Sequence, residues 1–200
     1  MQITKFFDIL LAKTMSKSLL DYFEAIPDPR KASGLRHHLG PFLAMATMAI
    51  MSGYKGFREL GSFMEANEEY FTKVFGLKHG VPKFVQIRTI FSRLDFDEVN
   101  KAFNQWAMQF MPEGSGNWVS GDGKGLSSTV TDMHGPTQDF VLIVSLFCHR
   151  TGIVLKTQRR HNGKGGEIPA LNELLAQLQT KGMIITLDAL HCKKNGSPDH

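Results

Sequence analysis

The sequence has little cysteine, and we find in it no long membrane-spanning run and no low-complexity segment. Its two cysteines, Cys148 and Cys192, stand far apart rather than in a C-x-x-C pair. This spacing argues against a disulfide framework or a zinc knuckle and indicates free thiols in a reducing cytoplasm. The apolar run from Phe42 to Met51 has about half of the roughly 20 residues that a membrane span requires. We therefore expect a buried helix there and no membrane partner.

Charge of one sign is only slightly in excess. The net charge is +4 and the isoelectric point is about 9.1, with 42% hydrophobic and 21% charged residues, proportions that are ordinary for a globular protein. The basic excess permits a polyanionic partner such as nucleic acid without requiring one. The 200 residues allow one large domain or two small ones, and the Pro/Gly/Ser-rich segment 111–116 is the predicted boundary.

The two sides of this boundary differ in pattern. Before it, apolar spacing predicts helices at 18–26, 41–51, 57–65, 68–75, 83–94 and 97–110. After it we expect strands at 118–121, 139–150, 153–159 and 183–187, the middle two forming a hairpin. An amphipathic helix is expected at 168–180, before the last strand, with these residues inward: Ile168, Leu171, Leu174, Leu175 and Leu178. The pattern predicts an α+β protein.

Two aspartates follow predicted strands. Asp122 comes after the strand at 118–121, between two glycines, and Asp188 comes after the strand at 183–187. Carboxylates delivered from two strands suit Mg²⁺ or Mn²⁺, and nucleases and polymerases use such sites on phosphodiesters. Each residue also has a structural interpretation, Asp122 as a turn residue and Asp188 as the N-cap of a helix. If the strands are neighbours, the two carboxylates repel unless a cation or a proton lies between them.

Candidate DNA contacts occur in both halves. The helix at 83–94 has an apolar face and a polar face, and the polar face carries Arg88, Thr89, Ser92 and Arg93. In a helix-turn-helix-like unit this face would contact DNA, although an ordinary amphipathic surface helix has the same pattern. Lys124 is a candidate for a DNA phosphate, with a solvated loop lysine as the alternative. The segment 30–40 is a basic loop with Arg30, Lys31, Arg36, His37 and His38.

Six segments carry a resemblance. The first three are Leu19-Leu-Asp-Tyr-Phe-Glu-Ala-Ile-Pro-Asp-Pro-Arg30, Gly34-Leu-Arg-His-His-Leu39, and Val81-Pro82 leading to Phe91-Ser-Arg-Leu-Asp95. The others are Asp122-Gly-Lys124, Lys164-Gly-Gly-Glu167-Ile-Pro-Ala-Leu171 and Thr186-Leu-Asp188-Ala-Leu-His191-Cys192. In this order they resemble the DDE transposases of bacterial insertion sequences, of the H-repeat-associated type. The similarity covers nearly all of residues 18–192.

The resemblance implies a helical, transposase-associated, DNA-binding domain at 1–111. It implies the N-terminal part of an RNase H-like mixed α/β core at 117–200, with Asp122 and Asp188 as the first two catalytic, metal-binding acids. The cofactor would be Mg²⁺ or Mn²⁺, and the intact enzyme would cut DNA at element ends and join it to a target. The third acid of the family, a glutamate on a later helix, has no counterpart here.

Three functions remain open. The first is a C-terminally truncated, inactive insertion-sequence transposase, because the similarity ends within two residues of Cys192; apolar surface would then be exposed beside the last strand. The second is a non-catalytic DNA-binding remnant that modulates a full-length transposase. The third is an unrelated metal-dependent nuclease that draws another acid from Glu167 or Asp199. For the first two we expect a bacterial, nucleoid-associated protein of the cytoplasm, with a second copy or a full-length transposase as protein partner.

Overall fold

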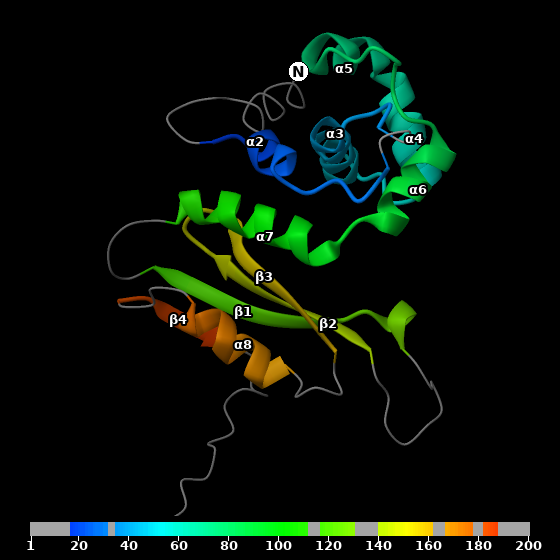
Figure 1. Cartoon of the computed structure of the whole chain (residues 1–200). Coiled ribbons are helices and arrows are strands. Elements are labelled where there is room, and N and C mark those ends of the chain that lie inside the picture. Colours follow the sequence, from blue (N-terminus) through cyan, green and yellow to red (C-terminus); the bar gives the residue numbers. More distant parts are fainter. Residues whose placement is uncertain are drawn as a thin grey trace, which may run out of the picture. The chain divides into compact units, whose positions relative to one another are not determined.

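The computed structural model describes residues 17–31, 35–111, 117–130, 140–161, 167–177 and 182–187. The chain divides into two compact units, residues 1–106 and 107–200, which we call the helical unit and the sheet unit. In the described part each unit has its own buried core. Helices fill the first unit and a mixed sheet forms the second (Figure 1). The α+β fold class expected from the sequence is therefore confirmed.

The described helices of the helical unit lie close to the predicted ranges. They are α2 (Leu19–Glu24), α3 (Leu39–Met51), α4 (Phe57–Ala66), α5 (Glu68–Phe75), α6 (Phe84–Arg93) and α7 (Phe96–Ala107). Local chemistry fixes several of their ends. Ser18 and Asp21 form a capping box at the start of α2, and Gly76 ends α5 in the left-handed conformation with φ 61°. None of the described helices is long and apolar enough to cross a membrane.

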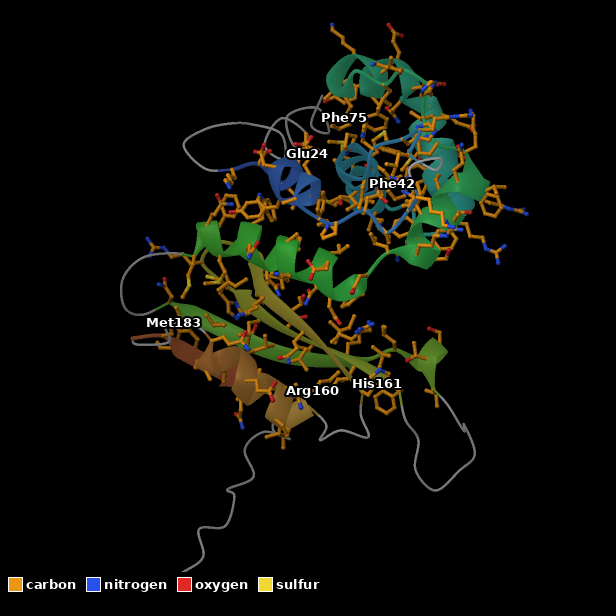
Figure 2. The ribbon with its side chains drawn as sticks, in the orientation of Figure 1. Glu24, Phe42, Phe75, Arg160, His161 and Met183 are labelled. Carbon is orange, nitrogen blue, oxygen red and sulfur yellow. The ribbon has the colours of Figure 1, made fainter. Side chains whose placement is uncertain are left out.

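Helix α3 forms the centre of the helical unit. Phe42, Met45 and Met48 have no exposed surface, and Figure 2 labels Phe42 among the surrounding helices. Aromatic rings extend this core, since Phe42 meets Phe91 edge-on at 5.2 Å. The predicted buried helix is thus confirmed for most of its length. Its last two residues are an exception, because Ile50 and Met51 are 51% and 54% exposed at the helix end.

The sheet unit holds a four-stranded sheet in its described residues. Its elements are β1 (Trp118–Gly125), β2 (Val141–Cys148), β3 (Ile153–His161), α8 (Glu167–Ala176) and β4 (Ile184–Leu187), with short 3₁₀ turns at Met108–Phe110 and Ser127–Thr129. The strand order is β3-β2-β1-β4. Strands β1, β2 and β3 are antiparallel neighbours, whereas β4 runs parallel to β1. The hairpin predicted for the two middle strands is confirmed.

Helix α8 covers one face of the sheet (Figure 1). Ala170, Leu171 and Leu174 are buried there, together with the alternate residues of β2. The prediction that Ile168 also points inward is wrong, because Ile168 is 41% exposed. Ile168 is the second residue of the helix. It lies one turn before Leu171, so its side chain lies outside the core. Leu178 lies outside the described residues.

Strand β4 forms one margin of the described sheet. It pairs with β1 through four residues, and Ile184 and Ile185 are 42% and 36% exposed. Apolar surface is therefore exposed beside this strand within the described part of the chain. Gly182, which precedes it, has φ 80°, the left-handed conformation expected of a glycine after a helix.

Candidate functional site

Asp122 lies in the interior of β1, not after its end. The predicted strand stops at Gly121, but β1 continues to Gly125. The turn interpretation of Asp122 is therefore wrong. The reason is long-range, because Asp122 pairs with Ser145 on β2 and Lys124 pairs with Ile143. These partners hold a glycine-rich segment extended although it has little β-propensity of its own.

Asp122 is exposed on the sheet face opposite α8. A Cβ atom added to Gly121 would lie 2.6 Å from Leu171 Cδ1 and 2.9 Å from Leu187 Cδ2, so Gly121 faces α8. Successive residues of a strand point to opposite faces, and Asp122 is an exposed residue. We call its side of the sheet the Asp122 face.

Neighbouring strands add polar groups to the Asp122 face. Ser145 pairs with Asp122 on one side and with Thr157 on the other, so these residues form one row across three strands. The next row on this face begins with Lys124, which is exposed. Its pairing continues through Ile143 to Arg159 on β3. Asp122 therefore has basic groups one row away on the same face.

The parallel pair of β1 and β4 locates the position before each candidate acid. Gly121 is the register partner of Leu187. In the sequence, Asp122 directly follows Gly121 and Asp188 directly follows Leu187. Asp188 itself lies outside the described residues. The structure thus makes neighbours of the two strands whose predicted ends carry the acids.

The described donors suit a hard cation but do not form a complete cluster. No group of three or more His, Cys, Asp or Glu able to hold a metal ion occurs in the part of the chain that the structure describes. Asp122 offers exposed carboxylate oxygens on a sheet, the donor type that Mg²⁺ and Mn²⁺ favour. The cofactor expectation stays a prediction.

Helix α6 has the two faces that its sequence predicts. Ile87 and Ile90 are buried, and the four candidate DNA contacts are all exposed: Arg88, Thr89, Ser92 and Arg93. Two of these side chains, Thr89 and Ser92, already donate their hydroxyl hydrogens to backbone carbonyls. Thr89 Oγ1 donates to the Val85 carbonyl at 2.8 Å, and Ser92 Oγ donates to the Thr89 carbonyl at 3.0 Å. Toward a ligand these hydroxyls accept rather than donate, so among the four candidates only the two arginines have N–H groups that can donate to a phosphate.

A hollow beside α6 adds basic residues that the DNA-contact prediction did not include. Arg36 and His37 line it together with Thr89 and Arg93, and its volume is about 330 Å³. His37 is buried. Burial lowers the pKa of His37, and the positive charges of His79, Arg36 and Arg30 lower it further. The signal in the sequence was the basic segment 30–40, which gave no indication that it lies against α6.

The helical unit matches a known family. Residues 20–107 match the family described as DDE_Tnp_1-associated. This range includes the described helices α3 to α7 and nearly all of α2. The matching range therefore contains the α6 face and the residues of the adjoining hollow.

Three relatives share similarity along most of this chain. The chain is 30% identical to "Putative transposase YncI" of Escherichia coli O157:H7 over 179 residues, which cover 90% of this chain and 45% of the relative. The corresponding protein of E. coli K12 is 29% identical, with 90% and 71% covered. "H repeat-associated putative transposase YbfD" of E. coli K12 is 25% identical over 185 residues, with 90% and 70% covered.

These matches confirm the resemblance that the sequence motifs indicate. They extend over both units, because they cover 90% of the chain. The chain spans less than half the length of the first relative and about seven-tenths of the other two.

Proposed function

We propose, since the chain is a relative of the H repeat-associated transposases, that its sheet unit carries the first two acids of a metal-dependent phosphoryl-transfer centre. Asp122 and Asp188 would bind the metal ion, Mg²⁺ or Mn²⁺, and the reaction of the intact enzyme would be DNA cleavage and strand transfer. The parallel register of Gly121 with Leu187 carries this proposal, because each acid is the next residue along its strand sequence.

The geometry of the described residues supports the pairing. Ser120 and Thr186 are register partners on the face where Asp122 points, since residues two apart in a strand share a face. On the same count, a strand continued by one residue would put Asp188 on the Asp122 face beside Asp122. The two carboxylates would then repel at close range and favour a cation between them. Without a cation this repulsion would destabilise the fold, and binding of a cation would relieve it.

The topology supports an RNase H-like interpretation of the sheet unit. Three antiparallel strands are followed by α8 and by a strand parallel to β1, and the resemblance implies a mixed sheet. A bound Mg²⁺ or Mn²⁺ would stabilise the charge of the attacking and leaving oxygens. The chain's own groups would hold the ion through Asp122 and Asp188 and orient a DNA phosphate through Lys124. Truncation and inactivity stay predictions, as do Glu167 and Asp199 as alternative acids.

Metal binding by the full chain tests the two acids. Mn²⁺ would be titrated into the purified protein and the free ion followed by electron paramagnetic resonance. We expect Asp122→Asn and Asp188→Asn each to weaken Mn²⁺ binding by about tenfold or more, which corresponds to about 1.4 kcal/mol. Glu69→Gln, an exposed acid of α5, removes the same charge in the other unit and should leave the affinity unchanged. Equal affinities for all four proteins would overturn the metal site.

Activity is measured separately from metal binding. A supercoiled plasmid would be incubated with the chain and Mg²⁺ or Mn²⁺, and nicking followed on a gel. We expect no nicking, since a third carboxylate is not assigned in this sequence. Nicking that disappears in Asp122→Ala would show that the inactivity prediction is wrong while supporting the catalytic site.

A second candidate function is DNA binding without catalysis, which would modulate a full-length transposase. The exposed face of α6, with Arg88 and Arg93, favours it. Duplex binding by the full chain, measured in EDTA, should survive Asp188→Ala and weaken in Arg88→Ala or Arg93→Ala. Both proposals place the protein on chromosomal DNA in the bacterial cytoplasm. A second copy or a full-length transposase as partner stays a prediction.

A further inference from the structure

The hollow beside α6 is bounded by positive charge. We call it the basic groove: it is lined by Arg30, Arg36, His37 and Arg93, with Val85, Gln86, Thr89 and Ile90 completing its described walls. Its volume is about 330 Å³, which admits a phosphate group with several waters, because one water occupies about 30 Å³. No Asp or Glu occurs among these lining residues. The described lining residues therefore contribute positive charge and no carboxylate of their own.

Arg30 forms the fixed floor of the basic groove. Its side chain is 5% exposed and pairs with Asp28 at 2.5 Å. Its guanidinium also donates to the His37 carbonyl at 2.7 Å. This bond ties the chain at residue 30 to the segment that carries Arg36 and His37. Arg30 has its counter-charge in Asp28, so its role is to position the neighbouring residues.

Arg36 and Arg93 supply the charge that remains unbalanced. They come from different segments, the loop before α3 and the last turn of α6, and both are exposed residues that line the groove. In the described part of the chain, neither forms an ion pair with a carboxylate. Two guanidinium groups around one hollow repel each other unless an anion lies between them. The planar donors of guanidinium match the oxygens of a phosphate.

A second hollow continues the positive surface. It shares Arg36 and His37 with the basic groove and has a volume of about 180 Å³. Lys78 and His79 line it as well, again without an acidic residue among its described walls. The charges of His79, Arg36 and Arg30 all act on His37 in the same direction, and together with burial they lower its pKa. Several residues of this surface therefore contribute positive charge near His37.

We propose that the basic groove takes one phosphodiester group of a DNA backbone between Arg36 and Arg93. This inference rests on the proposed DNA function and names the contact by which the helical unit would hold the strand. Val85, which is 68% exposed at the groove, would offer apolar contact to the adjoining sugar. Thr89 would not donate to the phosphate, because its hydroxyl hydrogen is bound to the Val85 carbonyl. Contacts to phosphates fix position on DNA and carry no base preference.

The test measures binding of the full chain to a short fluorescent DNA duplex in EDTA at several salt concentrations. Arg36→Gln and Arg93→Gln should each reduce the slope of log affinity against log salt by about 0.9, the value for one phosphate contact. The double variant should lose less affinity than the product of the two single-variant fold losses, because both arginines contact the same phosphate group. Lys73→Gln removes an exposed positive charge on α5 outside the groove and should keep the wild-type slope.

The variant Arg88→Gln distinguishes DNA binding in the groove from DNA binding by the exposed face of α6, because Arg88 does not line the groove. Binding that weakens in Arg88→Gln and Arg93→Gln but not in Arg36→Gln would overturn the groove and leave DNA binding by α6 intact. If all groove variants bind the duplex with the affinity of the wild type, the groove proposal is also overturned. Absence of any duplex binding at low salt would reject the groove and the DNA-binding function together. Mn²⁺ binding by Asp122 and Asp188 is independent of all these outcomes.

The ring of His37 reports on the source of the phosphate. An anion in the groove should raise the pKa of His37, measured by NMR titration with the duplex and with inorganic phosphate. We expect the duplex to raise it and to exclude inorganic phosphate. If inorganic phosphate raises this pKa and the duplex neither raises it nor competes, the groove is a site for free phosphate and the proposal is overturned.

Discussion

At the scale of single residues, the Asp28–Arg30 pair stabilises the fold as well as the groove. Both the side chain and the backbone N–H of Arg30 donate to Asp28, and the side-chain bond lowers the pKa of Asp28. Asp28→Asn would leave the buried Arg30 guanidinium with a weaker partner. We expect the free energy of unfolding to fall by about 1–3 kcal/mol, measured by urea denaturation.

An exposed ion pair provides the comparison. Lys83 and Glu65 lie 2.9 Å apart with side chains 61% and 48% exposed. Exposed pairs contribute little, because water screens them and long side chains lose entropy. Glu65→Gln should therefore lower the free energy of unfolding by much less than Asp28→Asn does. A larger loss from Glu65→Gln than from Asp28→Asn would contradict the assignment of burial as the cause.

His37 makes the stability of the helical unit depend on pH. Its pKa in the folded protein lies below the ordinary value of 6.5, so the unfolded chain takes up this proton first as the pH falls. Stability contributed by neutral His37 is therefore complete above pH 6.5 and is lost as the pH falls from 6.5 toward the lowered pKa. Denaturation at about pH 7.5 and about pH 5.5 should show a smaller difference in His37→Gln than in the wild type. His38→Gln, at an exposed neighbouring residue, should retain the wild-type difference.

At the scale of elements, Gly121 allows side chains of α8 and β4 to approach β1 closely. A Cβ atom on Gly121 would lie 2.6 Å from Leu171 of α8 and 2.9 Å from Leu187 of β4. Gly121→Ala should therefore displace the ends of the Leu171 and Leu187 side chains, and we expect it to destabilise the protein by about 1 kcal/mol. Thermal unfolding measures this loss.

Gly61→Ala is the matched control. Its added Cβ atom would meet Ile87 Cδ1 at 3.5 Å, an ordinary contact, within helix α4. Since alanine suits a helix interior better than glycine, we expect stabilisation of about 0.5–1 kcal/mol. Comparable losses in both variants would show that packing around Gly121 is not the limiting factor.

At the scale of the whole molecule, the chain is organised around two separate cores. The described core around Phe42 and Phe71 belongs to residues 1–106, and the core around Val144 and Leu155 belongs to residues 107–200. Because a domain has its own core, we expect residues 1–106 expressed alone to be helical and to unfold cooperatively. Circular dichroism during heating tests this. A fragment without a cooperative transition would mean that the helical unit depends on the rest of the chain.

The sequence by itself determined the helices and the hairpin, because their causes are local. Apolar residues at helical spacing decided which face of α6 is buried, and Gly76 ended α5. The resemblance motifs also needed no structure to be recognised, and the relatives confirm them. Boundaries differ from the predicted ones by a few residues: α2 and α6 are shorter, and β1 is longer because it pairs with β2.

Only the tertiary structure decided where the candidate groups meet. The segment Gly121 to Gly125 became a strand because β2 pairs with all of it, whereas β4 pairs only as far as Gly121; its own glycines gave no local reason for an extended chain. Arg36 and Arg93 came to line one groove because the loop before α3 is tied to Arg30 beside α6. Contacts between residues far apart in the chain depend on packing of whole elements, and no local pattern encodes them.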